Sequence, residues 1–114
     1  MTMERYAWKG MVLKGKKDEY IKRHDEIWPE MKEVLKAAGI CNYSIYMYEL
    51  DDAEFDAEVF GYYECEKGIE YAGRYQAESD VVARWDESMK GILILEKDEK
   101  TGAQKQMKQV FRLD

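Results

Sequence analysis

The single proline of the chain, Pro29, interrupts a segment that otherwise has a helical pattern. Residues 16–38 repeat apolar side chains at helical spacing, and Gly39 follows at a position where glycine commonly ends a helix. Because proline lacks a backbone N–H and disfavours helical geometry at the residue before it, we expect the helix to end or kink just after His24. The break can aim the imidazole of His24, the only histidine, into a cavity. In the alternative interpretation His24 is a buried ring bonded to a carbonyl, and Pro29 simply opens a second helix.

Alternating apolar and polar side chains predict strands on both sides of this helical region. Strands are expected over residues 5–14, 41–48, 55–64 and 107–113. In the second of them Cys41, Tyr43, Ile45 and Met47 are expected on one face. In the third the alternate residues from Phe55 to Tyr63 are expected on one face. Both faces of this hairpin carry large aromatic side chains, so we expect neither face to be fully solvated.

The order of the expected elements defines the fold class. Helices are expected over residues 66–77 and from the cap residues Ser79 and Asp80 onward, followed by a polar loop over 96–104. Strand, helix, strand, strand, helices and strand predict a single domain, residues 1–114, with an α+β, ferredoxin-like fold of the dimeric α/β barrel type. Its antiparallel sheet has helices on one face. A second copy of the chain is the simplest cover for the other face, so we expect a homodimer.

Charge and composition exclude several kinds of partner. The formal net charge is -6, and the sequence has no basic face with interleaved aromatic residues, so neither nucleic acid nor an acidic membrane surface is an expected partner. No apolar run follows the first five residues, so no signal peptide is predicted and a cytoplasmic location is expected. The two cysteines, Cys41 and Cys65, form no metal-binding motif with His24 and are expected to be reduced thiols.

Three motifs resemble those of a known family. Arg23-His24-x-x-Ile27-Trp28-Pro29-Glu30 resembles the signature of the L-rhamnose mutarotases, Asn42-Tyr43-x-Ile45-Tyr46 resembles a second motif, and Arg84-Trp85 with Met89 resembles a third. Val110-Phe111 fits the closing strand, and the similarity covers residues 7–113. The resemblance implies an isomerase, a small dimeric ferredoxin-like protein. It would interconvert the α and β pyranose anomers of the monosaccharide L-rhamnose without a metal or an organic cofactor.

The resemblance also implies roles for individual residues. His24 matches the catalytic acid, and Tyr20 and Tyr43 match tyrosines that contact the substrate. Trp85 matches the first of two consecutive tryptophans that contact the sugar, whereas Asp86 stands where the family has the second. An aspartate offers two acceptors for sugar hydroxyls in place of an apolar plate, so another sugar such as L-fucose is an alternative substrate.

Mutarotation opens and recloses a hemiacetal, which requires proton transfer at fixed geometry. His24 is expected to donate a proton to the ring oxygen and accept it on return, with Tyr20 or Tyr43 as candidates for the second group. On residue pattern alone both tyrosines are ordinary core residues. Two rival functions remain: a haem-dependent or cofactor-free oxygenase on the same fold, and a non-catalytic module that binds a sugar.

Overall fold

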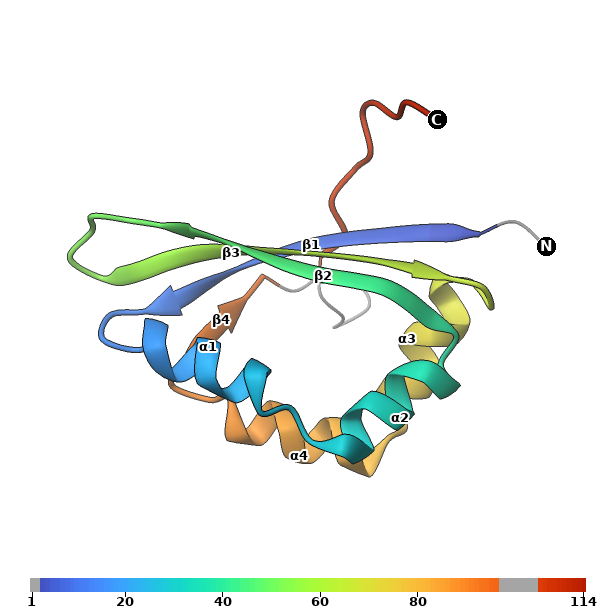
Figure 1. Cartoon of the computed structure of the whole chain (residues 1–114), viewed down its shortest axis with the longest axis horizontal. Coiled ribbons are helices and arrows are strands. Elements are labelled where there is room, and N and C mark those ends of the chain that lie inside the picture. Colours follow the sequence, from blue (N-terminus) through green and yellow to red (C-terminus); the bar gives the residue numbers. More distant parts are fainter. Residues whose placement is uncertain (1–2, 97–104) are drawn as a thin grey trace.

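The computed structural model describes residues 3–96 and 105–114, and it places a four-stranded sheet over a layer of helices (Figure 1). The strands are β1 (Glu4–Leu13), β2 (Ile40–Glu49), β3 (Phe55–Cys65) and β4 (Leu93–Leu95). The helices are α1 (Lys17–Asp25), α2 (Pro29–Ala37), α3 (Ile69–Ala77) and α4 (Asp80–Ser88). The strand order is β2-β3-β1-β4, with every neighbouring pair antiparallel. This arrangement confirms the predicted α+β, ferredoxin-like class.

The core lies between the sheet and the helices. On β3 the alternate residues Ala57, Val59, Gly61 and Tyr63 are buried, as their spacing predicts. From the adjacent strand β1, Trp8 and the other alternate residues face the same way and join the same apolar cluster. We refer to this side of the sheet as the inner face and to the opposite side as the outer face.

The break at Pro29 falls where the sequence predicts it. Helix α1 ends at Asp25, Trp28 has extended backbone angles (φ -60°, ψ 137°), and Pro29 is the first residue of α2. Both interpretations of the proline therefore hold, because it separates the helices and also opens the second one. Ile27 lies beyond the end of α1, so it does not share the helical face of Tyr20 and His24 as the spacing suggested.

Helix α1 is held at both ends by side chains. At its start, the Asp56 carboxylate on β3 accepts the backbone N–H of Lys17 at 3.0 Å, which satisfies one of the free donors of the first turn. Near its end, Arg23 donates to the Glu19 carboxylate and to the Ser88 carbonyl at the C-terminus of α4. These contacts fix the position of the next residue, His24.

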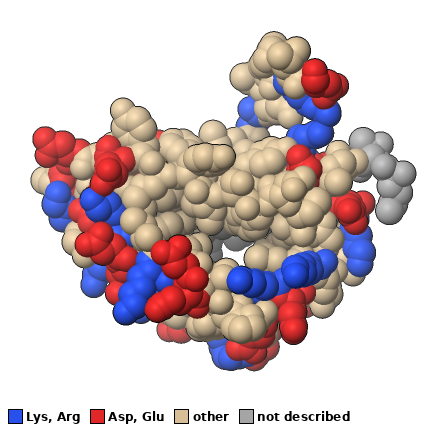
Figure 2. All heavy atoms as spheres, in the orientation of Figure 1, with Lys and Arg blue, Asp and Glu red and all other residues tan. Residues whose placement is uncertain are grey.

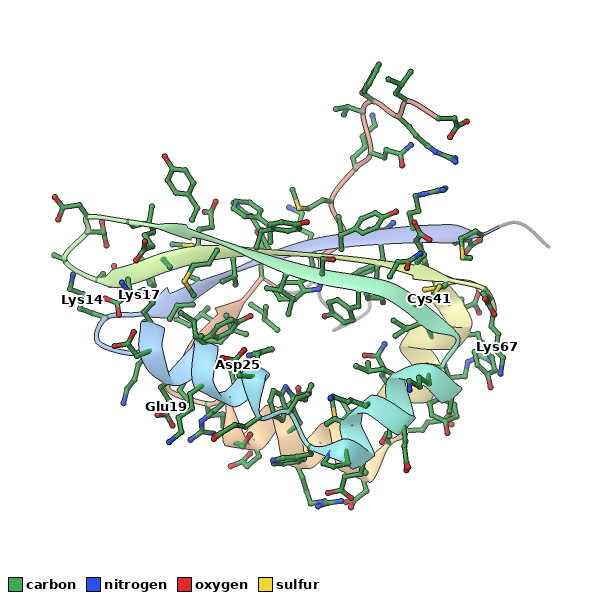
Figure 3. All side chains as sticks on the ribbon, in the orientation of Figure 1. Lys14, Lys17, Glu19, Asp25, Cys41 and Lys67 are labelled. Atoms are coloured by element: carbon green, nitrogen blue, oxygen red, sulfur yellow. The ribbon has the colours of Figure 1, made fainter. Side chains whose placement is uncertain are left out.

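A β-bulge in β2 changes the face of one predicted residue. The register with β3 shifts between Cys41 and Ser44, and Asn42 has a left-handed backbone with φ 49°. Cys41 pairs with Glu64 and so faces outward, which corrects the prediction that it shares a face with Tyr43 (Figure 3). The extra residue restores Tyr43 to the inner face, which is the usual effect of such a bulge.

The predicted strand over residues 107–113 is wrong. The sheet edge beside β1 is formed by β4, residues 93–95, which come directly after the helical region. Met107 donates its backbone N–H to the Ala7 carbonyl, and the chain then leaves the sheet on the side away from the helices (Figure 1). β4 pairs with only Gly10, Met11 and Val12 of that β1 edge, and after the Met107 contact the chain does not continue along it. Residues 97–104 of the predicted loop lie outside the described residues.

Within the described ranges, no helix is both long enough and apolar enough to cross a membrane.

Candidate functional site

The rings of four residues, from α1, from α4 and from Trp28 just before α2, form a connected cluster around His24. The Tyr20 and His24 rings stack, with 4.3 Å between their centroids. The Trp85 indole meets the His24 ring edge-on at 5.4 Å and the Trp28 ring edge-on at 5.3 Å. The one-turn spacing of Tyr20 and His24 produces the stack, and the extended backbone before Pro29 brings Trp28 to Trp85. The cluster fixes the plane of the imidazole.

The hydrogen bond of His24 defines its tautomer. Nδ1 lies 3.0 Å from the Tyr20 carbonyl oxygen. A carbonyl can only accept, so Nδ1 carries the proton and the neutral ring has an unprotonated Nε2. Burial lowers the pKa of His24, and this effect exceeds the opposing ones of the Tyr20 carbonyl and Asp25. The ring is therefore neutral at pH 7, with one nitrogen free to accept a proton.

The Tyr20 hydroxyl is buried without a hydrogen-bond partner. The side chain is 3 % exposed, and within the described ranges its hydroxyl is the one buried side-chain N or O atom that lacks such a bond. Burial raises the pKa of Tyr20, and the electrostatic effect of Tyr43 raises it further. Because an unsatisfied buried hydroxyl is costly, this group is a candidate contact for a bound molecule.

Tyr43 approaches the same interior from the sheet. Its ring centroid lies 5.1 Å from that of the buried Tyr63, and its hydroxyl oxygen accepts the Trp8 indole N–H at 3.1 Å. Burial raises the pKa of Tyr43 to about 12, while the Trp8 hydrogen bond acts in the opposite direction. The phenol is therefore protonated at neutral pH and already has one fixed donor beside its oxygen.

The surface is hollowed between the sheet and the helices, on the side seen in Figure 2. Tyr43 keeps about a third of its surface exposed although its ring packs against Tyr63 on the inner face, which borders the space between the sheet and the helices. A separate groove of about 310 Å³ lies between α1 and α4, lined by charged residues with Trp28, Trp85 and Ser88. That groove includes neither His24 nor either tyrosine, so we place the candidate site in the hollow.

The structure brings together most of the residues predicted from the sequence. The His24 ring contacts those of Tyr20 and Trp85, and Tyr43 acts electrostatically on Tyr20 by raising its pKa. Asp86 lies on α4 directly after Trp85 with an exposed side chain. Its proposed contact with sugar hydroxyls stays a prediction. No group of three or more acidic, histidine or cysteine side chains suited to a metal ion occurs in the described part of the chain.

The sequence did not identify Trp8 as a residue of the site. Its indole lies over Gly61 on the neighbouring strand, and an added Cβ at Gly61 would come within 2.1 Å of the indole. A glycine inside a strand is a known signal that another group approaches the backbone closely. Gly61 therefore indicated that another group approaches the backbone of β3. Only the pairing of Trp8 with Gly61 in the β1–β3 register identifies that group as Trp8.

Such an arrangement is suited to proton transfer on a small polar ring. It combines a neutral imidazole acceptor, two phenols, and apolar rings that can cover one face of a sugar. None of these groups needs to form a covalent bond with a substrate.

Comparisons with known proteins identify one family. A family model described as L-rhamnose mutarotase matches residues 5–113. An L-rhamnose mutarotase of Bacillus subtilis is 38% identical over 112 residues, covering 98% of this chain and 100% of the relative. One of Listeria monocytogenes is 43% identical over 91 residues, covering 80% and 81%. The crystal structure of an L-rhamnose mutarotase from Formosa agariphila superposes with a TM-score of 0.69 at 28% identity, covering 97% of this chain and 99% of that one.

Proposed function

The chain belongs to the L-rhamnose mutarotase family, and from this premise we propose that it is an isomerase that interconverts the α and β pyranose anomers of L-rhamnose. The observation that carries the proposal is the His24 imidazole, which is neutral, fixed in one tautomer and stacked on a buried phenol that lacks a partner. A sugar hydroxyl or ring oxygen would supply the missing hydrogen bonds.

The reaction needs only proton transfer at two oxygen atoms of one carbon. As the hemiacetal opens, the anomeric hydroxyl loses a proton and the ring oxygen gains one; closure on the other face reverses both steps. We propose that His24 is catalytic and exchanges a proton with the sugar, while Tyr20 and Tyr43 contact it. Trp85 covers the apolar face of the ring, and Asp86 accepts sugar hydroxyls.

The test is the exchange rate between sugar anomers, measured by saturation-transfer NMR. We expect the protein to accelerate exchange of L-rhamnose well above the buffer rate, and L-fucose run in parallel tests whether Asp86 has changed the sugar. A non-catalytic sugar-binding module is the second candidate. It would be stabilised by the sugar, by about 2.7 kcal/mol at a ligand concentration 100 times Kd, without faster exchange.

We also propose that the protein is a homodimer joined through the outer face of the sheet. Tyr46 on β2 and Ile94 on β4 are 70% and 50% exposed on that face. A groove of about 320 Å³ at the β1–β4 side is lined by Met11 and Ile94, with Gly10 and the charged Lys9 and Glu96. The C-terminal segment leaves the sheet on the same side and carries Phe111, which is 77% exposed. Apolar surface of this extent on one face is typical of a subunit interface, and a second copy of the chain provides matching surface by two-fold symmetry.

Sedimentation measurements test the homodimer. We expect twice the mass of the chain at micromolar concentration, and a Tyr46→Glu variant is expected to sediment as a monomer because it would bury charges at the interface. A monomeric wild-type protein would contradict the proposal.

We also propose a cytoplasmic location, and the thiols of the two cysteines support it. Cys41 and Cys65 are both free, and burial raises the pKa of the Cys65 thiol to about 11. A reduced, protonated and buried thiol fits a reducing compartment.

A further inference from the structure

We propose that Trp28 is a positioning residue, which fixes Trp85 and through Trp85 the orientation of the His24 imidazole. Arg84 in turn holds the Trp28 indole in place. This inference rests on the proposed mutarotase function and adds to it a residue that supports the ring of the proposed catalytic histidine. It leaves the role of His24 in the reaction unchanged.

The indole of Trp28 is the end of a series of ring contacts that leads to His24. Its centroid lies 5.3 Å from that of Trp85, and the two rings are almost perpendicular, at 89°. Trp85 contacts the His24 imidazole in the same manner, at 5.4 Å and 88°. Aromatic pairs with this edge-to-face geometry are favourable beyond the area that they bury. The orientation of Trp28 therefore constrains that of the imidazole through one intermediate ring.

Trp85 depends on its neighbours for a fixed position. It is only partly buried and packs against the edge of the core. It also lines the groove of about 310 Å³ between α1 and α4, together with Trp28. A side chain beside open space keeps alternative rotamers unless a neighbour fills that space. Trp28 is such a neighbour, so a smaller side chain at position 28 would widen the groove and give the Trp85 indole room to turn.

The position of Trp28 is fixed by its backbone and by Arg84. Trp28 has extended backbone angles, and this conformation is favoured because Pro29 follows it as the first residue of α2. The Arg84 guanidinium lies over the Trp28 ring, with its central carbon 5.9 Å from the ring centroid. A cation over the face of an indole is attracted by the negative charge of that face. Trp28 is therefore contacted by two consecutive residues of α4, Arg84 and Trp85.

Two carboxylates hold the Arg84 guanidinium in this place. Its two terminal nitrogens donate to the Glu30 carboxylate oxygens at 3.4 and 3.3 Å, and Nε donates to Asp80 at 3.0 Å. Guanidinium groups bonded in this forked manner keep one orientation. Arg84 and Glu30 are both half-exposed, and ion pairs of this kind contribute little to stability. We therefore assign the pair to geometry: it joins the start of α2 to α4, which lies beside the connection from α1 (Figure 1).

A fixed imidazole matters because proton transfer requires alignment of the atoms that exchange the proton. Small misplacements of a catalytic group, even from a distant substitution, lower the rate strongly. The hydrogen bond from His24 Nδ1 to the Tyr20 carbonyl, at 3.0 Å, defines the tautomer only while the ring keeps its plane. If Trp85 turns, the imidazole can turn as well, and the hydrogen bond, the single tautomer and the burial of the ring are weakened together.

The first experiment observes His24 directly, by NMR of the ring nitrogens in the full-length protein. His24 is the only histidine, so its two ring nitrogens can be assigned without ambiguity. In the wild type we expect one tautomer, with the proton on Nδ1. In Trp28→Leu we expect a mixture of the two tautomers, because leucine removes the ring that faces Trp85. This readout requires no activity.

The titration of the same signals gives a second readout. Burial is the main cause that lowers the His24 pKa, so a looser ring should have a pKa closer to the ordinary value. The Tyr20 carbonyl and Asp25 on α1 also act on the charge of His24, whereas Trp85, which faces it from α4, has no titratable group. All of these groups are retained in the Trp28 variants, so an upward shift reports the loss of burial.

The second experiment measures NMR exchange kinetics on L-rhamnose for the same variants. Trp28→Leu is expected to lower kcat about ten- to a hundredfold. Trp28→Phe keeps an aromatic ring beside Trp85 and should restore most of kcat and the single tautomer of His24. Arg84→Met removes the cation over the Trp28 ring at a half-exposed position, and we expect a smaller loss of kcat, about two- to fivefold.

Tyr75→Leu is the matched control. It breaks the contact between the rings of Tyr71 and Tyr75 on α3, whose centroids are 6.1 Å apart, and this pair is separate from the rings that contact His24. Tyr75 is also partly exposed, so the loss of packing is comparable in kind. We expect wild-type kcat and wild-type His24 signals. Thermal melts of all variants show whether a loss of stability alone changes either readout.

Three results would overturn the inference while leaving the proposed function intact. The first is a folded Trp28→Leu protein with wild-type kcat and one His24 tautomer, and the second is equal impairment in Trp28→Phe. The third is an Arg84→Met protein with wild-type kcat and wild-type His24 signals, which decides the test if Trp28→Leu does not fold. If instead the wild type does not accelerate exchange, the proposed function fails, and the His24 signals still decide whether Trp28 positions the ring.

Discussion

Replacing His24 with alanine is expected to reduce the enzyme-catalysed exchange of L-rhamnose anomers by about 10²–10⁴-fold. The reason is that the His24 imidazole is neutral near pH 7 and its Nε2 can accept a proton, and alanine removes that group. The fold should survive, because the ring is only partly buried and its hydrogen bond is to a carbonyl within its own helix. Saturation-transfer NMR gives the rate, and circular dichroism melts give the stability.

A His24→Asn variant is the matched control for this prediction. The asparagine amide can donate to the Tyr20 carbonyl as Nδ1 does, but it cannot accept and return a proton. If His24 transfers protons, both variants lose activity equally. If the asparagine variant keeps most of the activity, His24 only positions the substrate and the proton-transfer role is lost.

The sequence was informative where a local rule determined the structure. Pro29 predicted the break that ends α1 and opens α2, because its missing N–H and its effect on the preceding residue act within the chain segment itself. The alternation of Ala57, Val59, Gly61 and Tyr63 predicted the inner face of β3 for the same reason. His24 and Tyr20 followed from helical spacing, and the resemblance assigned them to a site.

The bulge in β2 was not predictable in this way. Asparagine at position 42 tolerates a left-handed backbone but does not require one, and the Asn42 amide is fixed only by the Glu64 carboxylate across the strand pair at 2.8 Å. The bulge decides that Tyr43 faces inward and Cys41 outward. The face of Tyr43 is therefore fixed by the register between β2 and β3, which pairs residues far apart in sequence.

The prediction of a closing strand over residues 107–113 was wrong for a related reason. Residues 107–113 have a strand-like pattern, yet the sheet edge they would need is taken by β4 for only three residues and the chain then turns away. Exposed apolar residues indicate that the segment packs against another surface, but they do not identify that surface. The proposed homodimer would supply that surface from a second copy.

Substituting Gly61 is expected to have the largest effect on stability. A Cβ at this position would lie 2.1 Å from Cε2 and 2.2 Å from Nε1 of Trp8, far inside contact distance, and the buried indole has no free space to move into. Overpacking of a core usually costs about 1–3 kcal/mol, and we expect Gly61→Ala to reach at least the upper end of that range, about 3 kcal/mol. Urea denaturation measures the free energy of unfolding, with an unchanged m-value as the sign that only stability has shifted.

The double variant Trp8→Ala/Gly61→Ala identifies the source of the strain. Removing the indole removes the clash, so the two substitutions should be strongly non-additive, with the double variant more stable than the sum of the single losses predicts. Gly73→Ala is the control, because Gly73 lies inside α3 with open space where a Cβ would be added, and alanine there should be neutral or stabilising by up to about 1 kcal/mol. An additive cycle, or a Gly61→Ala protein as stable as the wild type, would mean that the indole is not pinned against β3. The same result would remove the reason why Trp8 can hold the Tyr43 hydroxyl in one orientation.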